Sequence, residues 1–370
     1  MLFQPPLPPK YAAMSEADLV EAIVCRKRQF GSRLVILGHH YQQDEVIQFA
    51  DFTGDSLKLS QIGGEQREAE LIVFCGVHFM AESADILTDD DVTVVLPDLS
   101  AGCSMADMAD IDDLEEAWEY MVDECGERVV PITYVNSAAS IKAFCGGHGG
   151  ACCTSSNASQ VLEWAFAQGD KVLFLPDQHL GRNTAYAMGI PPAQMAVYDP
   201  SERNGGLTRD RVRRARVLLW KGHCSVHALF TPHQCDEIRS IDPDYKVIVH
   251  PECAWEVVQK ADFAGSTEFI IKTIRESPTG SKWAVGTEVH LVNRLTRTNP
   301  DKSIRLLAGI QCLCTTMYRI DLKHLCWCLD ELAAGRCVNP IRVQPETKRL
   351  ARFALERMLE NVSPVPVAVK

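Results

Sequence analysis

Nine short apolar runs, rich in β-branched residues, recur along the chain. They occupy residues 33–38, 70–76, 92–98, 129–136, 171–177, 216–222, 246–252, 282–288 and 303–309. Apolar and polar positions do not alternate within them, which is typical of parallel strands covered by helices on both faces. The pattern therefore predicts nine β-strands in parallel sheets.

The segments between these runs have polar starts and helical patterning. Ser56 precedes LKLSQI, and Asn157 precedes ASQVLEWAFAQ, which Gly169 ends. Ser15 begins a capped amphipathic helix before the first run, and two helices are expected after the last, in 320–335 and 345–362. A succession of strand, helix and strand predicts right-handed crossovers and an α/β fold.

The nine runs fall into three groups of three with similar features at matching places. A polar cluster follows the first run of each group, a hydroxyl-rich segment then opens a helix, and the third run ends in a cysteine-bearing loop. We therefore predict three similar three-layer α/β/α domains, each with a short parallel sheet, arranged with pseudo-threefold symmetry around a central cavity. The predicted domains are residues 1–120, 121–235 and 236–316, with C-terminal helices in 317–370 that pack back on the core.

Composition excludes several kinds of partner. Of the 370 residues 46% are hydrophobic, which is ample for buried cores, and the net charge of −12 leaves no basic field for nucleic acid or anionic membranes. No apolar stretch approaches a membrane span, and the first residues lack the layout of a signal peptide. We expect a cytoplasmic protein that binds neither nucleic acid nor membrane.

The chain has fifteen cysteines. In a reducing compartment disulfides are rare and most thiols are buried, so position must identify any functional cysteine. The loops after the third runs carry Cys103, Cys224 and either Cys312 or Cys314. Ligands bind beyond the carboxyl ends of parallel strands, so domains that face a common axis place one thiol each around one centre. Three thiolates suit a metal ion or an iron–sulfur cluster with one open coordination position.

The polar segments at the strand ends resemble the successive signatures of one known family. They are GHHYQQDEVIQFADFTGDSL, PDLSAGCSMAD, YVNSAASIKA, CCTSSNA, the pair Cys224 and His227, HPEC, AGSTEFI and CTTMYRI. In this order they resemble quinolinate synthases, iron–sulfur enzymes of NAD biosynthesis. The resemblance implies condensation of iminoaspartate with dihydroxyacetone phosphate, with loss of phosphate and water, to quinolinate at an open-site [4Fe-4S] cluster. It also suggests functional coupling to an enzyme that oxidises L-aspartate.

The resemblance further implies roles for individual residues. Cys103, Cys224 and Cys314 are the expected cluster ligands, and Cys314 is preferred to Cys312 because it stands three residues before Met317. The expected catalytic residues are His39, Tyr41 and Glu252, which can move protons during ring closure and dehydration. The expected substrate-binding residues are His39, Ser56, Tyr134, Asn136, Ser155, His227, His250, Glu252, Ser266 and Thr267.

Other interpretations of these residues stay open. The hydroxyl residues can simply cap helices, which contributes about 1 kcal/mol each, and His40 is expected to support the fold. Histidines after the second runs, at positions 78, 179 and 290, are expected to buttress neighbouring loops. The spacing of Cys145, Cys152 and Cys153 matches no zinc finger, so they are left outside the metal site. Alternative functions are an iron–sulfur redox or iron sensor, and a mononuclear zinc hydrolase that uses Cys224, His227 and a neighbouring carboxylate.

Overall fold

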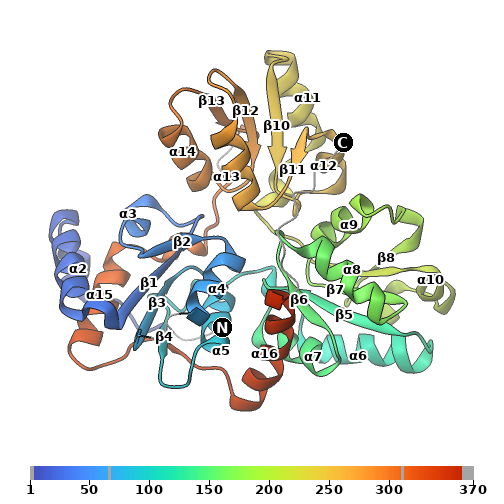
Figure 1. The fold of residues 1–370 in the computed structure, drawn as a ribbon, viewed down its shortest axis with the longest axis horizontal. Coiled ribbons are helices and arrows are strands. Elements are labelled where there is room, and N and C mark those ends of the chain that lie inside the picture. The colour runs from blue at the N-terminus through green and yellow to red at the C-terminus, as the bar shows by residue number, and fades with distance from the viewer. Residues whose placement is uncertain (1–3, 66–67, 310–311, 361–370) are drawn as a thin grey trace. The chain divides into compact units, whose positions relative to one another are not determined.

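The computed structural model describes residues 4–65, 68–309 and 312–360. Packing divides the chain into two compact units: a first unit of Met1–Cys103 with Leu313–Gln344, and a second unit of Ser104–Cys312 with Pro345–Lys370. The first unit contains one mainly parallel sheet and the second contains two parallel sheets (Figure 1). This confirms the predicted α/β fold with three sheets. The domain boundaries and the pseudo-threefold arrangement around a cavity stay predictions.

The sheet of the first unit has the strand order β14-β4-β3-β1-β2. Its strands are β1 (Leu34–His39), β2 (Phe52–Gly54), β3 (Leu71–Cys75), β4 (Thr93–Val95) and β14 (Pro340–Ile341). Only the pair of β14 with β4 is antiparallel among the pairs described in this sheet. The helices are α1 (Pro9–Ala13), α2 (Glu16–Phe30), α3 (Asp44–Ile47), α4 (Ser56–Glu65), α5 (His78–Leu87) and α15 (Leu322–Ala333). Ser15 caps α2 as predicted, and α15 packs against that helix.

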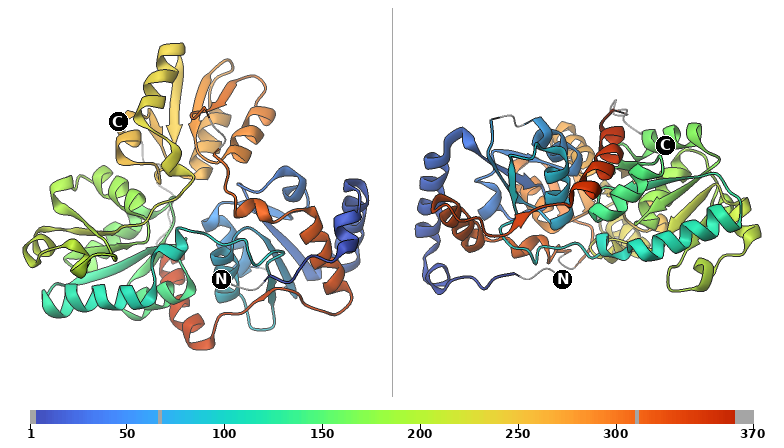
Figure 2. Two further views of the ribbon diagram at one scale, coloured as in Figure 1. Left: turned by 180° about the vertical axis from the view of Figure 1, so that it is seen from behind. Right: turned by 90° about the horizontal axis from the view of Figure 1, so that it is seen from below.

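The middle sheet, in the second unit, has the order β6-β5-β7-β9-β8. Its strands are β5 (Val129–Tyr134), β6 (Ala151–Cys153), β7 (Lys171–Leu175), β8 (Met195–Tyr198) and β9 (Val217–Trp220). Its helices are α6 (Ile111–Trp118), α7 (Ala139–Gly147), α8 (Ala158–Gln168), α9 (Gln178–Ala187), α10 (Arg209–Arg214) and α16 (Pro345–Glu360). The C-terminal helix α16 lies alongside α7 and β6 (Figures 1 and 2).

The third sheet, also in the second unit, has the order β11-β10-β12-β13. Its strands are β10 (Tyr245–Val249), β11 (Phe263–Ala264), β12 (Lys282–Gly286) and β13 (Ser303–Leu306). Its helices are α11 (Pro232–Ile241), α12 (Trp255–Lys260), α13 (Thr267–Glu276) and α14 (Val289–Thr298).

The three sheets share one topology, which confirms the repeat. The orders β2-β1-β3-β4, β6-β5-β7-β9 and β11-β10-β12-β13 correspond strand by strand. All nine predicted runs form strands, and each sheet adds a short edge strand beside the first. Because the corresponding strands are parallel, their carboxyl ends share one edge of each sheet, which is where the candidate chemistry was predicted.

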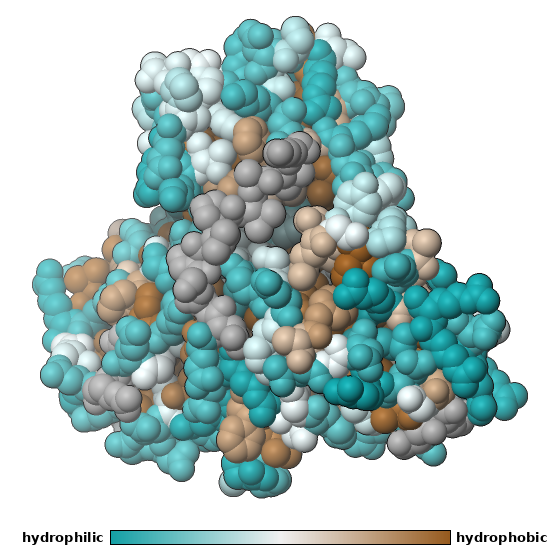
Figure 3. Space-filling view, turned by 45° about the vertical axis from the view of Figure 1, so that its right-hand side comes forward, coloured by the Kyte–Doolittle hydropathy of each residue, from teal (hydrophilic) through white to brown (hydrophobic). Residues whose placement is uncertain are grey.

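The strands are deeply buried, and the surface is mainly polar. All six residues of β1 are buried, as a parallel strand covered on both faces requires. Polar residues make up most of the face in Figure 3, with apolar ones scattered between them. Across the described ranges, no helix is both long and apolar enough to cross a lipid bilayer.

Candidate active site

The candidate active site of the second unit is built on the turn that follows β10. The chain continues from this strand through His250, Pro251 and Glu252 before α12 begins. The N–H of Cys253 donates to the carbonyl of His250 at 3.0 Å, and the N–H of Glu252 donates to Nδ1 of His250 at 3.3 Å. The turn leaves only 3% of Glu252 and 2% of His250 exposed.

Two side chains at or beyond the ends of strands of the middle sheet bond to the Glu252 carboxylate. Tyr134, the last residue of β5, donates its hydroxyl to Oε1 at 2.6 Å. His227, in a 3-10 turn after β9, bonds Oε2 through Nδ1 at 2.8 Å. Burial acts to raise the pKa of Glu252, but the imidazoles of His250 and His227 and the hydrogen bonds from His227 and Tyr134 lower it by more. The carboxyl group is therefore ionised at neutral pH.

The two imidazole rings beside the carboxylate stack on each other, and each is also hydrogen-bonded to a hydroxyl group. The rings of His227 and His250 have centroids 4.6 Å apart. Nε2 of His227 lies 3.2 Å from Oγ1 of Thr287, and Nε2 of His250 lies 3.2 Å from Oγ of Ser155. Burial lowers the pKa of His250 to about 3, which keeps this ring neutral at physiological pH. If Nδ1 of His227 donates to Glu252, its Nε2 accepts from Thr287, which gives a continuous path for protons.

The same region contains a possible metal-binding set. Cys224, His227 and Glu252 each offer one donor atom, and these atoms lie within 4.8 Å of one another. Cys224 is partly exposed in the loop after β9. Such donors suit zinc. However, His227 and Glu252 are already bonded to each other, so the structure shows a hydrogen-bonded acid–base group at this place.

Asn136 lies two residues beyond Tyr134, as the sequence predicted for the substrate side of the site. Its Oδ1 is buried and has no hydrogen-bond partner among the described residues. Buried amide oxygens are nearly always satisfied in folded proteins, so an unsatisfied one is typical of a site completed by a ligand or by water. This favours the predicted role of Asn136 in binding.

The predicted hydroxyl residues differ in what they do locally. Ser266 caps α13 through its Oγ, and Thr267 is the first residue of that helix. Ser155 instead bonds an imidazole, as described above. Ser56 is the first residue of α4, but the side chain that caps this helix is that of Asp55. The capping interpretation is therefore correct for Ser266 and wrong for Ser56 and Ser155.

In the first unit, His39 and Tyr41 lie together at the end of β1. The N–H of Tyr41 donates to Nδ1 of His39 at 3.1 Å, and the two rings meet edge to face with centroids 4.8 Å apart. This confirms that the two side chains project to the same side. Because Nδ1 accepts a hydrogen bond, the neutral His39 ring carries its proton on Nε2. His39 is 4% exposed, so it is held firmly in place.

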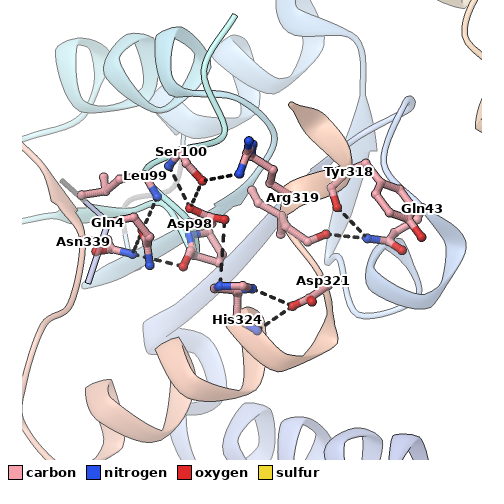
Figure 4. Close-up of polar contacts among 12 residues, drawn as sticks. Gln4, Gln43, Asp98, Leu99, Ser100, Tyr318, Arg319, Asp321, His324 and Asn339 are labelled. Atoms are coloured by element: carbon pink, nitrogen blue, oxygen red, sulfur yellow. Dashed lines mark hydrogen bonds and ion pairs between the residues drawn. The ribbon is translucent and has the colours of Figure 1, made fainter. Parts of the chain in front are cut away.

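A polar network joins the two segments of the first unit that carry the predicted cluster ligands, residues 98–103 and 314–324 (Figure 4). Asp98 accepts from the N–H and the hydroxyl of Ser100, at 2.8 and 2.5 Å. Arg319 donates from Nη1 to the same hydroxyl at 3.3 Å. The two cysteine-bearing segments are thus bonded to each other through side chains.

His324 completes this network at the start of α15 (Figure 4). Its Nδ1 lies 2.8 Å from Oδ1 of Asp321, and its Nε2 lies 3.9 Å from Oδ2 of Asp98. Burial acts to lower the pKa of His324, but the hydrogen bond to Asp321 and the charges of Asp321 and Asp98 raise it above its ordinary value. When this ring is protonated, it bridges two carboxylates on different segments.

The cysteines differ in exposure, and all fifteen lie within the described residues. Ten are buried, two are exposed, and three have intermediate exposure. The three intermediate cysteines are Cys103, Cys224 and Cys314. Cys312 is buried, and burial together with the charge of Glu288 raises its pKa to about 11, which opposes the thiolate that a metal requires. These differences favour Cys314 over Cys312 as a ligand, and the assignment of the three thiols to a cluster stays a prediction.

The cysteines of the segment FCGGHGGACC have a different environment. Cys145 lies in α7, and Cys152 and Cys153 lie in β6. All three are buried, and burial raises the pKa of each, that of Cys152 to about 12. They behave as packed core thiols, in keeping with their omission from the metal site.

Two buried residues just beyond the ends of strands of this region were not predicted from the sequence. Thr287 follows β12 and bonds His227. Asp177 follows β7 and caps α9 through Oδ1, while its Oδ2 has no hydrogen-bond partner in the described part of the chain. Burial and then the charge of Glu252 raise the pKa of Asp177 well above its ordinary value. Both residues lie at the polar end of a predicted run, 171–177 or 282–288, and this position was the available signal.

These features define an enzyme of the α/β class, with a buried acid–base group at the carboxyl ends of parallel strands. Residues 21–360 match the family described as Quinolinate synthetase A protein. The chain is 57% identical over 355 residues to the quinolinate synthase of Geobacillus kaustophilus, covering 95% of this chain and 96% of the relative. It is also 57% identical over 354 residues to that of Herpetosiphon aurantiacus, with 95% and 94% covered, and 56% identical over 353 residues to that of a Nocardioides species, with 93% and 90% covered. The chain belongs to the quinolinate synthase family.

Proposed function

We propose that this enzyme condenses iminoaspartate with dihydroxyacetone phosphate to form quinolinate, with release of phosphate and water. The observation that carries the proposal is the ionised, buried Glu252 held between the Tyr134 phenol and the His227 imidazole, in a chain of this family. Ring formation from these substrates needs repeated proton transfers, which such a group supplies. A cytoplasmic location and supply of iminoaspartate by an L-aspartate-oxidising enzyme belong to the same proposal.

Glu252 acts as the acid–base residue in this proposal. Its carboxylate accepts a proton from carbon when the new bonds form, and the resulting acid protonates the hydroxyl group that leaves as water. Tyr134 and His227 each bond one oxygen of the Glu252 carboxylate, which fixes the direction in which Glu252 transfers protons. Thr287 behind His227 extends the hydrogen-bonded path and keeps this ring in one tautomer.

The substrates are anions, and the protein provides local donors for them in place of a basic field. Ser266 and Thr267 lie at the N-terminus of α13, where backbone N–H groups favour negative charge. Asn136, Ser155 and His250 are neutral polar groups around the Glu252 turn. These side chains bind the carboxylate and phosphate oxygens of the substrates without adding a positive charge that would pair with the Glu252 carboxylate.

The remaining proposed residues belong to the cluster and to the first unit. Cys103, Cys224 and Cys314 would hold a [4Fe-4S] cluster, which would supply Lewis-acid chemistry toward small acids. His39 and Tyr41 form a second pair able to exchange protons with substrate, and Ser56 offers a hydroxyl at the start of α4. His39 donates from Nε2 because its Nδ1 is already engaged.

The test replaces Glu252 with glutamine, which keeps the shape of the side chain and removes its charge. We expect quinolinate formation, assayed anaerobically from both substrates, to fall by about 100-fold or more, with iron content unchanged. The matched control is Glu256→Gln, in the exposed first turn of α12, which should keep activity within about twofold. Full activity of Glu252→Gln with an intact cluster would refute the acid–base role.

The grouping of Cys224, His227 and Glu252 favours one second candidate, a mononuclear zinc hydrolase. Zinc there would require the bond between His227 and Glu252 to open, because both groups would turn toward the metal. Metal analysis after anaerobic purification separates the candidates. Iron and sulfide with broad visible absorption support the synthase, whereas colourless protein with one zinc supports the hydrolase.

A further inference from the structure

A single side chain of the middle sheet's α9 holds the backbone on both sides of Glu252. Asn183 is 7% exposed, and its Nδ2 donates to the carbonyl of Pro251 at 2.8 Å and to that of Cys253 at 2.9 Å. An amide nitrogen carries two hydrogens, so both are used on this one turn. The two acceptors also fix the orientation of the amide, because the flipped group would place its oxygen against two carbonyls.

The residues of the turn itself give its backbone little other support. Pro251 has no N–H to donate. The backbone bond across the turn runs from Cys253 to His250, and the N–H of Glu252 bonds the ring of His250. At its start the turn is linked to β12, because the N–H of His250 donates to the carbonyl of Gly286 at 3.1 Å. The contacts from Asn183 link the backbone on both sides of Glu252 to a different element, α9.

We infer that Asn183 is a positioning residue that sets the place of the Glu252 carboxylate by clamping the carbonyls of Pro251 and Cys253. The inference rests on the proposed role of Glu252. Asn183 fixes the backbone of Glu252 to α9, while Tyr134 fixes its carboxylate to the end of β5. Both anchors come from the middle sheet and its helices, so the carboxylate keeps a constant distance from that sheet. Displacements of about 1 Å in a catalytic group can reduce turnover by about 100-fold.

The test compares Asn183→Leu, which keeps similar volume and removes the amide, with Asn299→Leu. Asn299 is equally buried at 7% and donates from Nδ2 to the Leu295 carbonyl at 2.8 Å, at the end of α14. We expect Asn183→Leu to lower kcat by about 10- to 100-fold with KM changed less than about threefold. We expect Asn299→Leu to keep kcat within about twofold at a similar loss of thermal stability.

Hydrogen exchange provides a readout that does not depend on the reaction. The amides of Glu252 and Cys253 should exchange at least about tenfold faster in Asn183→Leu than in wild type or Asn299→Leu, because the turn has lost its anchor. If Asn183→Leu does not fold, Asn183→Asp, which has the same shape and no amide donors, is measured in its place.

The outcomes separate the two proposals. Unchanged exchange and a kcat equal to that of the Asn299 variant would overturn the role of Asn183 while leaving the synthase function intact. If wild-type protein forms no quinolinate, the proposed function fails, and the exchange measurement alone then decides whether Asn183 holds the turn.

Discussion

The packing of the C-terminal helix gives a sharp prediction for Gly146→Ala. Gly146 lies in α7 where this helix meets α16. A Cβ atom at this position would lie 2.0 Å from the carbonyl oxygen of Leu350 and 3.3 Å from the backbone nitrogen of Ala354. Because these are backbone atoms, no rotamer change relieves the overlap. The helices must separate by roughly 1.5 Å to restore ordinary contact distances.

The expected cost follows from two opposing effects. Alanine stabilises a helix interior over glycine by about 1 kcal/mol. Overpacking typically costs about 1–3 kcal/mol, and here a backbone-to-backbone contact places the cost at the upper end. Separation also loosens the buried side chains of α16, namely Ala351, Ala354, Leu355 and Met358. We therefore expect a net destabilisation of about 2 kcal/mol.

Gly147→Ala is the matched control. A Cβ at Gly147 would meet only the flexible methyl groups of Leu350, at 3.8 and 3.9 Å. This variant should be neutral or more stable by up to about 1 kcal/mol, through helix propensity alone. The assay is urea unfolding of both variants and wild type, followed by far-ultraviolet circular dichroism. Equal midpoints for the two variants would refute the close packing of α7 on α16.

Two further predictions concern the cysteines and pH. Cys314→Ser should lose most of its iron and visible absorption after anaerobic purification. Cys312→Ser should keep both, because Cys312 is a buried thiol. The reverse result would make Cys312 the third cluster ligand in place of Cys314. Burial lowers the pKa of His179 to about 4, so the unfolded chain binds this proton first as pH falls below about 6.5. Stability present above pH 6.5 is therefore lost toward pH 4, by about 2 kcal/mol after allowance for solvent screening. His179→Asn should flatten the dependence of melting temperature on pH in this window, and an unchanged slope would contradict the assignment.

The elements of the fold were largely predictable from the chain itself. The core strands appear as apolar runs because parallel strands are covered on both faces, and every predicted run forms a strand. The strands that were missed are β2, β6, β8, β11 and β14, each of two to four residues. These are too short to show periodicity, and β14 pairs with β4 from more than two hundred residues away. Local pattern contains no information about such pairings.

The sequence predicted which kinds of residue form the candidate site, but only part of the contacts between them. Positions after strands identified Tyr134, His250 and Glu252, because parallel topology places all such positions at one edge of a sheet. The bond from Tyr134 to Glu252 joins residues 118 apart, and no local pattern specifies which strand ends meet. Thr287 and Asn183 were missed for the same reason, since a buried polar residue is recognised by its partners.

The origin of these contacts determines how the site depends on the fold. Glu252 follows β10 of the third sheet. Yet the side chains that bond its carboxylate and the carbonyls on either side of it come from residues 25 to 118 positions away, in or beside the middle sheet. Each sheet has its own buried strands and can retain its core when one of these bonds is lost. The acid–base group, in contrast, exists only while both sheets keep their mutual register, since a shift between them separates the carboxylate from Tyr134, His227 and Asn183 together. Substitutions at the junction of the two sheets therefore affect turnover more than they affect the stability of either sheet.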